Sequence, residues 1–165
     1  GRFGVKVVVR ENTNGTIGSF EAAIVVPELK QAPLKVSSVV LSTQLQQSGR
    51  GRTASPLVRD GVGLVPSVTH VVGKDQKLYF YYEVYEPAEV EGGPQLKTSL
   101  AFYRGKVKVF ETPAVTRASI DAPDRKAALF QFEIPPNSLT PGLYTCQINI
   151  IDEAAAKFAF PPVAF

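Results

Sequence analysis

The sequence of 165 residues holds one cysteine, one histidine, no methionine and no tryptophan. Cys146 has no second cysteine with which to form an internal disulfide. A structural zinc site takes about four ligands, most of them cysteine or histidine, so Cys146 and His70 cannot build one. A serine-histidine-aspartate triad needs a histidine as general base, and the single His70 lies on a predicted strand, where a histidine is far more often structural. We therefore expect no catalytic residue and no metal ligand.

Motifs for cofactors and membranes are also missing. The sequence has no phosphate-binding loop and no Gly-x-Gly-x-x-Gly run, so we expect no cofactor. No apolar run approaches the ~20 residues that span a bilayer. The net charge of +3 is small and not clustered, which argues against a nucleic-acid partner. Carboxylates that a glycosidase needs as a pair are present, but nothing in their context selects two of them. They are Glu83, Glu86, Asp121, Asp124, Glu133 and Asp152.

The sequence is instead rich in strand-like alternation. Thirteen glycines and thirteen prolines separate runs in which every second residue is apolar, and helical periodicity is nearly absent. The predicted strands are 4–10, 17–26, 35–45, 67–72, 77–86, 96–103, 106–111, 127–134, 143–151 and 156–165. Asn14-Gly15 predicts a tight hairpin turn, because both residues tolerate a positive φ angle. The segment 46–63 predicts a mobile loop, most flexible at 49–52.

The strands after residue 66 predict an immunoglobulin-like β-sandwich, which has about seven strands in about a hundred residues. Tyr144 lies two residues before Cys146 at the start of a strand, the position of the corner tyrosine whose hydroxyl bonds back to the upstream backbone. The expected strands are B (77–86), C (96–103), C′ (106–111), E (127–134), F (143–151) and G (156–165). Without a partner cysteine, Cys146 is expected to be a small core residue.

The start of the chain resembles its end. The runs "GRFGVKVVVRE" (1–11) and "GLYTCQINIID" (142–152) both read glycine, any residue, aromatic, alternating apolar residues and an acid. The alignment places Phe3, Val5, Val7 and Val9 on Tyr144, Cys146, Ile148 and Ile150. We interpret 1–30 as a β-hairpin and linker left from a preceding sandwich-like repeat, and 31–165 as the complete sandwich. Chance similarity between two amphipathic hairpins is the alternative.

A hairpin on its own is marginal in water. Burying Phe3, Val5, Val7 and Val9 is worth ~1.5–3 kcal/mol each, an upper value if the unfolded chain is compact. The sum is comparable to the ~5–15 kcal/mol that stabilises a whole domain. We therefore expect the hairpin to pack on the sandwich or to associate with another copy of the chain.

One predicted strand, "LYFYYEVYE" (78–86), suggests a binding surface. Its even-numbered residues are expected to face the core, which leaves a second face of three tyrosines and a carboxylate: Tyr79, Tyr81, Glu83 and Tyr85. An exposed face of this kind would stack on sugar rings or grip a peptide. The alternative is that a neighbouring element covers it, because large apolar patches are seldom left exposed.

Four segments carry a family resemblance: "VKVVVRENTNGTIGSFEAAIVVPEL" (5–29), "LKVSSVVLST" (34–43), "LYFYYEVYEP" (78–87) and "LTPGLYTCQINIID" (139–152). Together they resemble the C-terminal region of bacterial, acidobacterial-type von Willebrand factor A-related proteins. The resemblance implies an exported or envelope-associated parent protein with β-sandwich repeats. The Asp-x-Ser-x-Ser metal cluster of the A domain is missing from this sequence, so no metal is implied.

We therefore expect a non-catalytic structural or protein–protein interaction module. Its expected partners are other protein domains, including domains of the same parent chain, or a second copy bound through the N-terminal hairpin. The alternative functions are a carbohydrate-binding module that uses Tyr79, Tyr81 and Tyr85, and an enzyme with a pocket at His70. The chain starts at Gly1 without an initiator methionine or a signal peptide, and we expect it to be a segment of a longer protein.

Overall fold

A computed structural model describes residues 1–26, 28–47 and 55–165. They divide into two compact units, Gly1–Ala32 and Pro33–Phe165, and both are built from antiparallel strands. The first unit contains β1 (Arg2–Arg10), β2 (Ile17–Val25) and the 3-10 turn η1 (Leu29–Gln31). The second contains β3 (Lys35–Val36), β4 (Val40–Gln47), β5 (Val58–Arg59), β6 (Val62–Pro66), β7 (Leu78–Tyr85), β8 (Glu89–Val90), β9 (Gly93–Pro94), β10 (Leu96–Arg104), β11 (Val107–Glu111), β12 (Val115–Arg117), η2 (Pro123–Arg125), β13 (Ala127–Ile134), β14 (Thr145–Asp152), β15 (Lys157–Ala159) and β16 (Pro162–Ala164). The predicted all-β class is confirmed.

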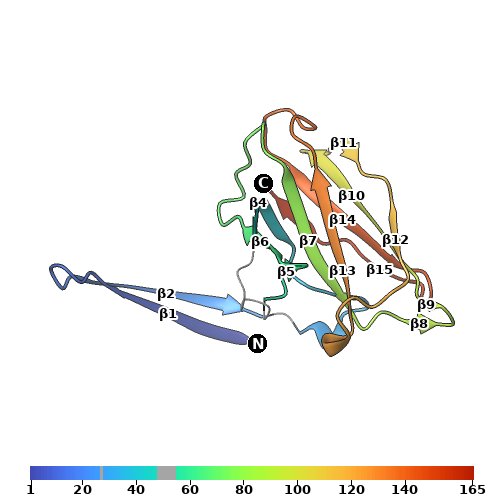
Figure 1. Cartoon of the computed structure of the whole chain (residues 1–165), viewed down its shortest axis with the longest axis horizontal. Coiled ribbons are helices and arrows are strands. Elements are labelled where there is room, and N and C mark those ends of the chain that lie inside the picture. Colours follow the sequence, from blue (N-terminus) through green and yellow to red (C-terminus); the bar gives the residue numbers. More distant parts are fainter. Residues whose placement is uncertain (27, 48–54) are drawn as a thin grey trace. The chain divides into compact units, whose positions relative to one another are not determined.

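The second unit is a β-sandwich of two main sheets. One sheet has the order β11-β10-β14-β15, with β12 paired to β10 and β16 paired to β14. The other has the order β13-β7-β4-β6-β5, with β3 paired to β7. Figure 1 shows β7 and β13 side by side along their length. Four pairs of neighbouring strands expected for the predicted sandwich are present: B with E, C with F, C with C′, and F with G. The immunoglobulin-like assignment itself stays a prediction.

Strand alternation explains how the two sheets bury a common core. On β7, Leu78, Phe80, Tyr82 and Val84 are at most 3% exposed and lie in the main core cluster, as the sequence predicts. The facing sheet contributes alternate residues of β10 and β14 to the same cluster. The rings of Phe80 and Phe102 meet edge to face, with centroids 5.7 Å apart. This contact joins the two layers, since an edge-to-face pair adds to the burial of each ring.

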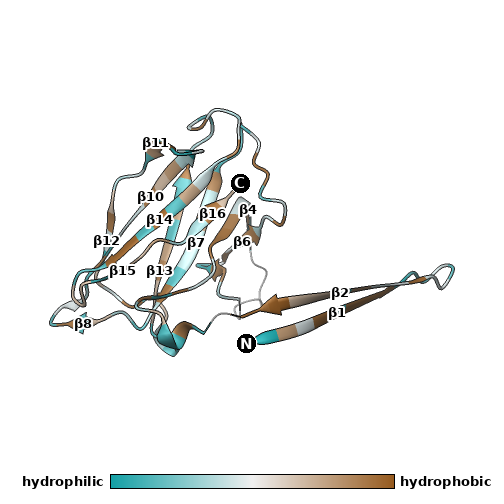
Figure 2. Cartoon of the chain, turned by 180° about the vertical axis from the view of Figure 1, so that it is seen from behind, coloured by the Kyte–Doolittle hydropathy of each residue, from teal (hydrophilic) through white to brown (hydrophobic). Residues whose placement is uncertain are grey.

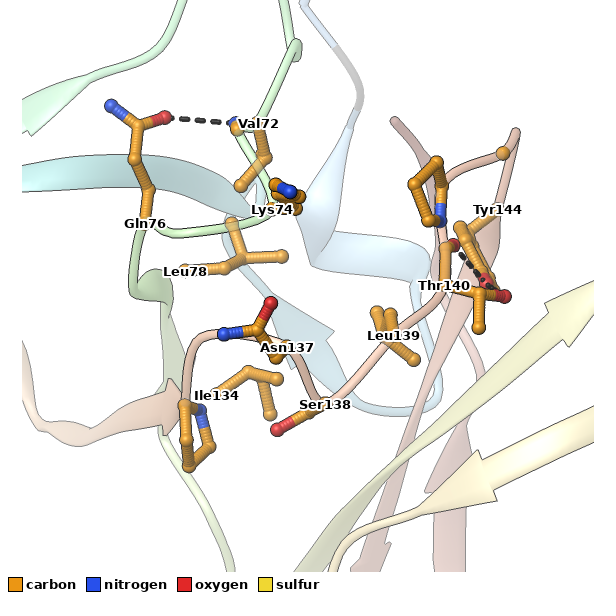
Figure 3. A pocket seen from close by; sticks show the side chains of 14 residues that line it. Val72, Lys74, Gln76, Leu78, Ile134, Asn137, Ser138, Leu139, Thr140 and Tyr144 are labelled. Atoms are coloured by element: carbon orange, nitrogen blue, oxygen red, sulfur yellow. Dashed lines mark hydrogen bonds between the residues drawn. The ribbon is translucent and has the colours of Figure 1, made fainter.

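Tyr144 forms the hydrogen bond that the sequence predicts. Its hydroxyl donates to the carbonyl oxygen of Thr140, upstream in the chain, at 2.6 Å. Its ring stacks on Phe165 with centroids 5.7 Å apart, and Arg104 lies over the ring. Figure 3 shows the bond to Thr140 beside a small pocket. The corner tyrosine therefore ties the loop before β14 to the last residue of the chain described.

The first unit is a two-stranded hairpin with an unbroken register. Nine residue pairs join β1 to β2, from Arg2–Val25 to Arg10–Ile17. Much of both strands is apolar, as the brown stretches in Figure 2 show. The predicted turn is present, but its geometry differs, because Gly15 alone of the Asn14-Gly15 pair has a positive φ angle (78°). The Glu11 carboxylate closes the turn by accepting hydrogen bonds from the N–H groups of Thr13 and Asn14.

Three predictions about the segment between β3 and β7 need correction. The predicted strand 67–72 is irregular, because His70 has a φ of 55°, which an extended strand does not allow. The predicted strand 35–45 is divided into β3 and β4. The predicted loop 46–63 contains β5 and the start of β6, and the glycine-rich part of that loop, 49–52, lies outside the described residues.

Candidate functional site

The tyrosine face of β7 is buried. Tyr79, Tyr81 and Glu83 are 6%, 7% and 2% exposed, and Tyr85 is half-buried. A second apolar cluster covers the face, to which β6, β13 and the segments beside β5 and η2 contribute Leu57, Leu64, Ala122, Ala127 and Leu129. The exposed stacking platform of the carbohydrate-binding alternative is therefore absent. The structure therefore agrees with the other alternative, in which neighbouring elements cover this face.

Glu83 is held at the centre of this face by a bidentate ion pair. Arg125 donates from Nε to Glu83 Oε2 at 2.9 Å and from Nη2 to Oε1 at 2.7 Å. The Tyr81 hydroxyl lies 2.5 Å from Glu83 Oε1 and 2.9 Å from the carbonyl oxygen of Pro56. Arg125 ends the 3-10 turn η2, which Pro123 begins, so the sequence Asp-Ala-Pro-Asp-Arg places the guanidinium over the strand.

The network shifts the pKa values of its members in opposite directions. Burial acts to raise the pKa of Glu83, but hydrogen bonds from Arg125, Tyr81 and Tyr85 and the charge of Arg125 outweigh it and hold the pKa below its ordinary value. Burial and the neighbouring Glu83 raise the pKa values of Tyr81 and Tyr85. The bond to Glu83 raises the pKa of Arg125. At neutral pH the site therefore holds one carboxylate, one guanidinium and neutral phenols.

An open groove of about 970 Å³ lies over this network. Its volume is within the ~300–1,000 Å³ of small-molecule sites. Asp121 and Arg59 line it and belong to a second ion cluster, in which Asp121 lies 3.4 Å from both Arg59 and Arg117 and accepts a hydrogen bond from the N–H of Leu129. Each carboxylate and guanidinium of the two clusters therefore has a partner within the fold. Such pairing braces η2 and β13 against β7, and the groove presents no unpaired charge from these residues to a ligand.

Sequence reasoning missed Arg125, and it named Asp121 only as one of six carboxylates among which nothing selected a pair. Both lie in the segment 121–126, which reads as a turn, and neither has a motif around it. Glu83 and Arg125 are 42 positions apart in the sequence. The one available signal was the carboxylate among tyrosines, because a buried carboxylate needs a cation.

The surroundings of His70 and Cys146 indicate that both residues have structural roles. His70 Nδ1 lies 2.9 Å from the carbonyl oxygen of Ala164. Cys146 is fully buried, as predicted, and burial raises the pKa of its thiol to about 12. Within the described ranges, no group of three or more histidine, cysteine, aspartate or glutamate side chains is arranged to hold a metal ion. Across the same ranges, no helix has the length and apolar character needed to cross a membrane.

The pocket beside the Tyr144 corner is small. It has a volume of about 110 Å³ and is lined by Val72, Leu78, Ile134 and Leu139 among others. Figure 3 shows these side chains around it. The volume is below the ~300–1,000 Å³ of small-molecule sites, so the pocket is a packing gap between loops at one end of the sandwich.

The hairpin carries the second candidate surface. Directly paired residues of an antiparallel sheet share a face, and on one face of β1–β2 every residue is apolar. We call this the apolar hairpin face: Phe3, Val5, Val7, Val9, Gly18, Phe20, Ala22 and Ile24. Its large side chains are between 40% and 67% exposed. The other face is mixed, with Arg2, Arg10 and an exposed ion pair between Lys6 and Glu21. Within the described part of its own unit, the two-stranded sheet has no second layer to cover either face.

Comparison of the chain with protein-family models, with curated proteins and with solved structures gave no significant match. The resemblance to von Willebrand factor A-related proteins stays a prediction, and the candidate surfaces rest on their own geometry.

Proposed function

We propose that this chain is a non-catalytic protein–protein interaction module, and that its binding surface is the apolar hairpin face. The observation that supports this proposal is the contrast between the two faces of the β1–β2 hairpin. One face has no polar side chain, and the other carries the hairpin's arginines and its Lys6–Glu21 ion pair. Such one-sided sheets normally pack their apolar side on a core.

The size of the apolar face supports this role. It has four large side chains on β1 and two on β2, which are 40–67% exposed, so a partner that buries them gains about half of the ~1.5–3 kcal/mol that full burial of each is worth. Association costs ~4–15 kcal/mol in lost translational and rotational freedom, so a specific complex needs the burial of all six side chains together. The sandwich unit, by contrast, covers its own aromatic face, so its tyrosines contribute to stability. An exported parent protein remains an expectation from the family resemblance alone.

The proposal is tested by capture with matched variants. Val7 lies on the apolar hairpin face and its neighbour Val8 on the mixed face, with exposures of 47% and 59%. The wild-type chain, Val7→Lys and Val8→Lys are immobilised, and proteins retained from an extract of the source cells are identified by mass spectrometry. We expect a protein that wild type and Val8→Lys retain and Val7→Lys loses. The same retained proteins for all three chains would refute the proposal.

A further inference from the structure

The β1–β2 hairpin repeats the geometry of another hairpin of the same chain, which β14 forms with β15 and β16. A gap-free alignment that places Phe3 on Tyr144 also places Ile24 on Phe165. Phe3 is the register partner of Ile24. Tyr144 and Phe165 exchange two backbone hydrogen bonds, at 2.9 and 3.1 Å. One offset therefore matches both strands and the register between them.

The match extends through the turns. Glu11 accepts a hydrogen bond from the N–H of Asn14 at 2.9 Å, and its counterpart Asp152 accepts one from the N–H of Ala155 at 3.1 Å. The next residue has a positive φ angle in both turns, 78° at Gly15 and 52° at Ala156. Equal turn length, the same carboxylate-to-amide bond and the same left-handed position make a chance likeness of two hairpins a poor explanation.

The C-terminal hairpin shows what surroundings this geometry has in a complete sandwich. β14 pairs with β10 from Thr145 to Asp152 on one edge. Its residues Cys146, Ile148 and Ile150 are fully buried in the core between the sheets. They are the counterparts of Val5, Val7 and Val9. The edge and the face are therefore used together, one for backbone pairing and the other for burial.

The same edge of β1 is open. Among the described residues, β1 pairs with β2 alone. Gly1 and Val26 exchange hydrogen bonds in both directions. Since bonded and non-bonded pairs alternate in an antiparallel ladder, the odd-numbered residues of β1 direct their amides to β2. The even-numbered residues direct theirs to the open edge, as the odd-numbered residues of β14 do towards β10.

We propose that the hairpin binds a separate β-sandwich domain that lacks its own last hairpin. In the complex, β1 pairs with the edge strand of that domain as β14 pairs with β10, and the apolar hairpin face closes its core. This is strand addition, in which the backbone ladder supplies affinity and alternate side chains supply specificity. The proposal rests on the proposed function and names the class of partner. A second copy of this chain does not fit, because β14, β15 and β16 fill that place in its own sandwich.

A graft within the full chain tests whether the hairpin can complete a sandwich. Residues 144–165 are replaced by a second copy of residues 3–24, which has the same length and places Val5, Val7 and Val9 in the core. The control replaces the same residues by 4–25, which shifts the alternation by one and places Lys6 and Arg10 there. We expect the in-register graft to unfold cooperatively in urea at a lower midpoint than wild type, and the shifted graft to lose the transition.

The proposal would be overturned if both grafts unfold cooperatively, or if neither does. A concentration-dependent dimer of the unmodified chain that Val7→Lys abolishes would also overturn it, because the face would then bind a second copy. Failure of the graft together with Val7-dependent capture of a protein would leave the proposed function standing and remove only this class of partner.

Discussion

Replacing Arg125 with methionine removes the cation from a carboxylate that the fold has buried. The Glu83 side chain is 3% exposed and the Arg125 side chain 33% exposed. Each of the two hydrogen bonds to the charged carboxylate is worth ~1.5–3 kcal/mol, and removal of one partner of a buried pair costs ~3–5 kcal/mol. A third of Arg125 is exposed, so water screens part of this interaction. We therefore expect a loss of about 2–3 kcal/mol in the free energy of unfolding at pH 7, at the lower end of these ranges.

The loss is expected to depend on pH. In wild type the folded-state pKa of Glu83 is below its ordinary value of 4.5. This group therefore stabilises the fold above that pH, and its contribution is lost as the pH falls through the lower, folded-state value. Without Arg125, burial is the dominant influence on Glu83 and raises its pKa. As the pH falls, protonation of Glu83 removes the unpaired buried charge and the variant recovers stability. The difference between the two chains should shrink between neutral and acidic pH.

Urea unfolding at pH 7 and at acidic pH measures these free energies of unfolding. Circular dichroism and tyrosine fluorescence follow the transition. The double variant Glu83→Gln/Arg125→Met serves as a control, because it leaves no unpaired charge and should be more stable at pH 7 than Arg125→Met. A loss below about 0.5 kcal/mol, the size of an ordinary surface effect, would refute the reasoning. An equal loss at both pH values would refute it as well.

Three further predictions concern the sandwich core. Phe102→Ala should cost about 3–5 kcal/mol in urea unfolding, and the control Phe158→Ala, at a site 63% exposed, less than about 0.5 kcal/mol; equal losses would contradict the assigned core. Tyr144→Phe removes the donor to Thr140 and should cost about 0.5–1.5 kcal/mol; an unchanged midpoint would count against the corner bond. Cys146, with its raised pKa and full burial, should react with a thiol reagent only after urea unfolding, and rapid labelling of the folded chain would contradict its burial.

Sequence alternation predicted the sandwich well because the pleat of a strand fixes its period at two residues. It assigned the core face of β7 and the burial of Cys146, and it located Tyr144 from its spacing to that cysteine, but it left open whether the tyrosine face of β7 is covered. These features depend on local pattern and on burial. The same logic linked the N-terminal hairpin to β14 and its partner strands, whose register and turns the structure then matched residue by residue.

The remaining features depend on contacts that no local pattern contains. The run 67–72 alternates like a strand, yet Val68 and Val71 are 94% and 75% exposed, because His70 turns the backbone out of the extended conformation. The ion pair of Glu83 and Arg125 joins a strand to a distant turn, and only the tertiary packing shows which cation pairs with Glu83. Short strands such as β5 are set by pairing with β6 rather than by their own composition.

Photo-crosslinking from the hairpin tests the central claim most directly. A benzophenone amino acid is placed at Val7 or at Val8, next to each other on opposite faces, and the chain is irradiated with the protein that it captures. Exposure alone favours Val8, which is 59% exposed against 47% for Val7. The account predicts a crosslinked complex from Val7 and little or none from Val8. Equal crosslinking from both positions, or crosslinking from Val8 alone, would contradict the claim that the apolar hairpin face binds the partner.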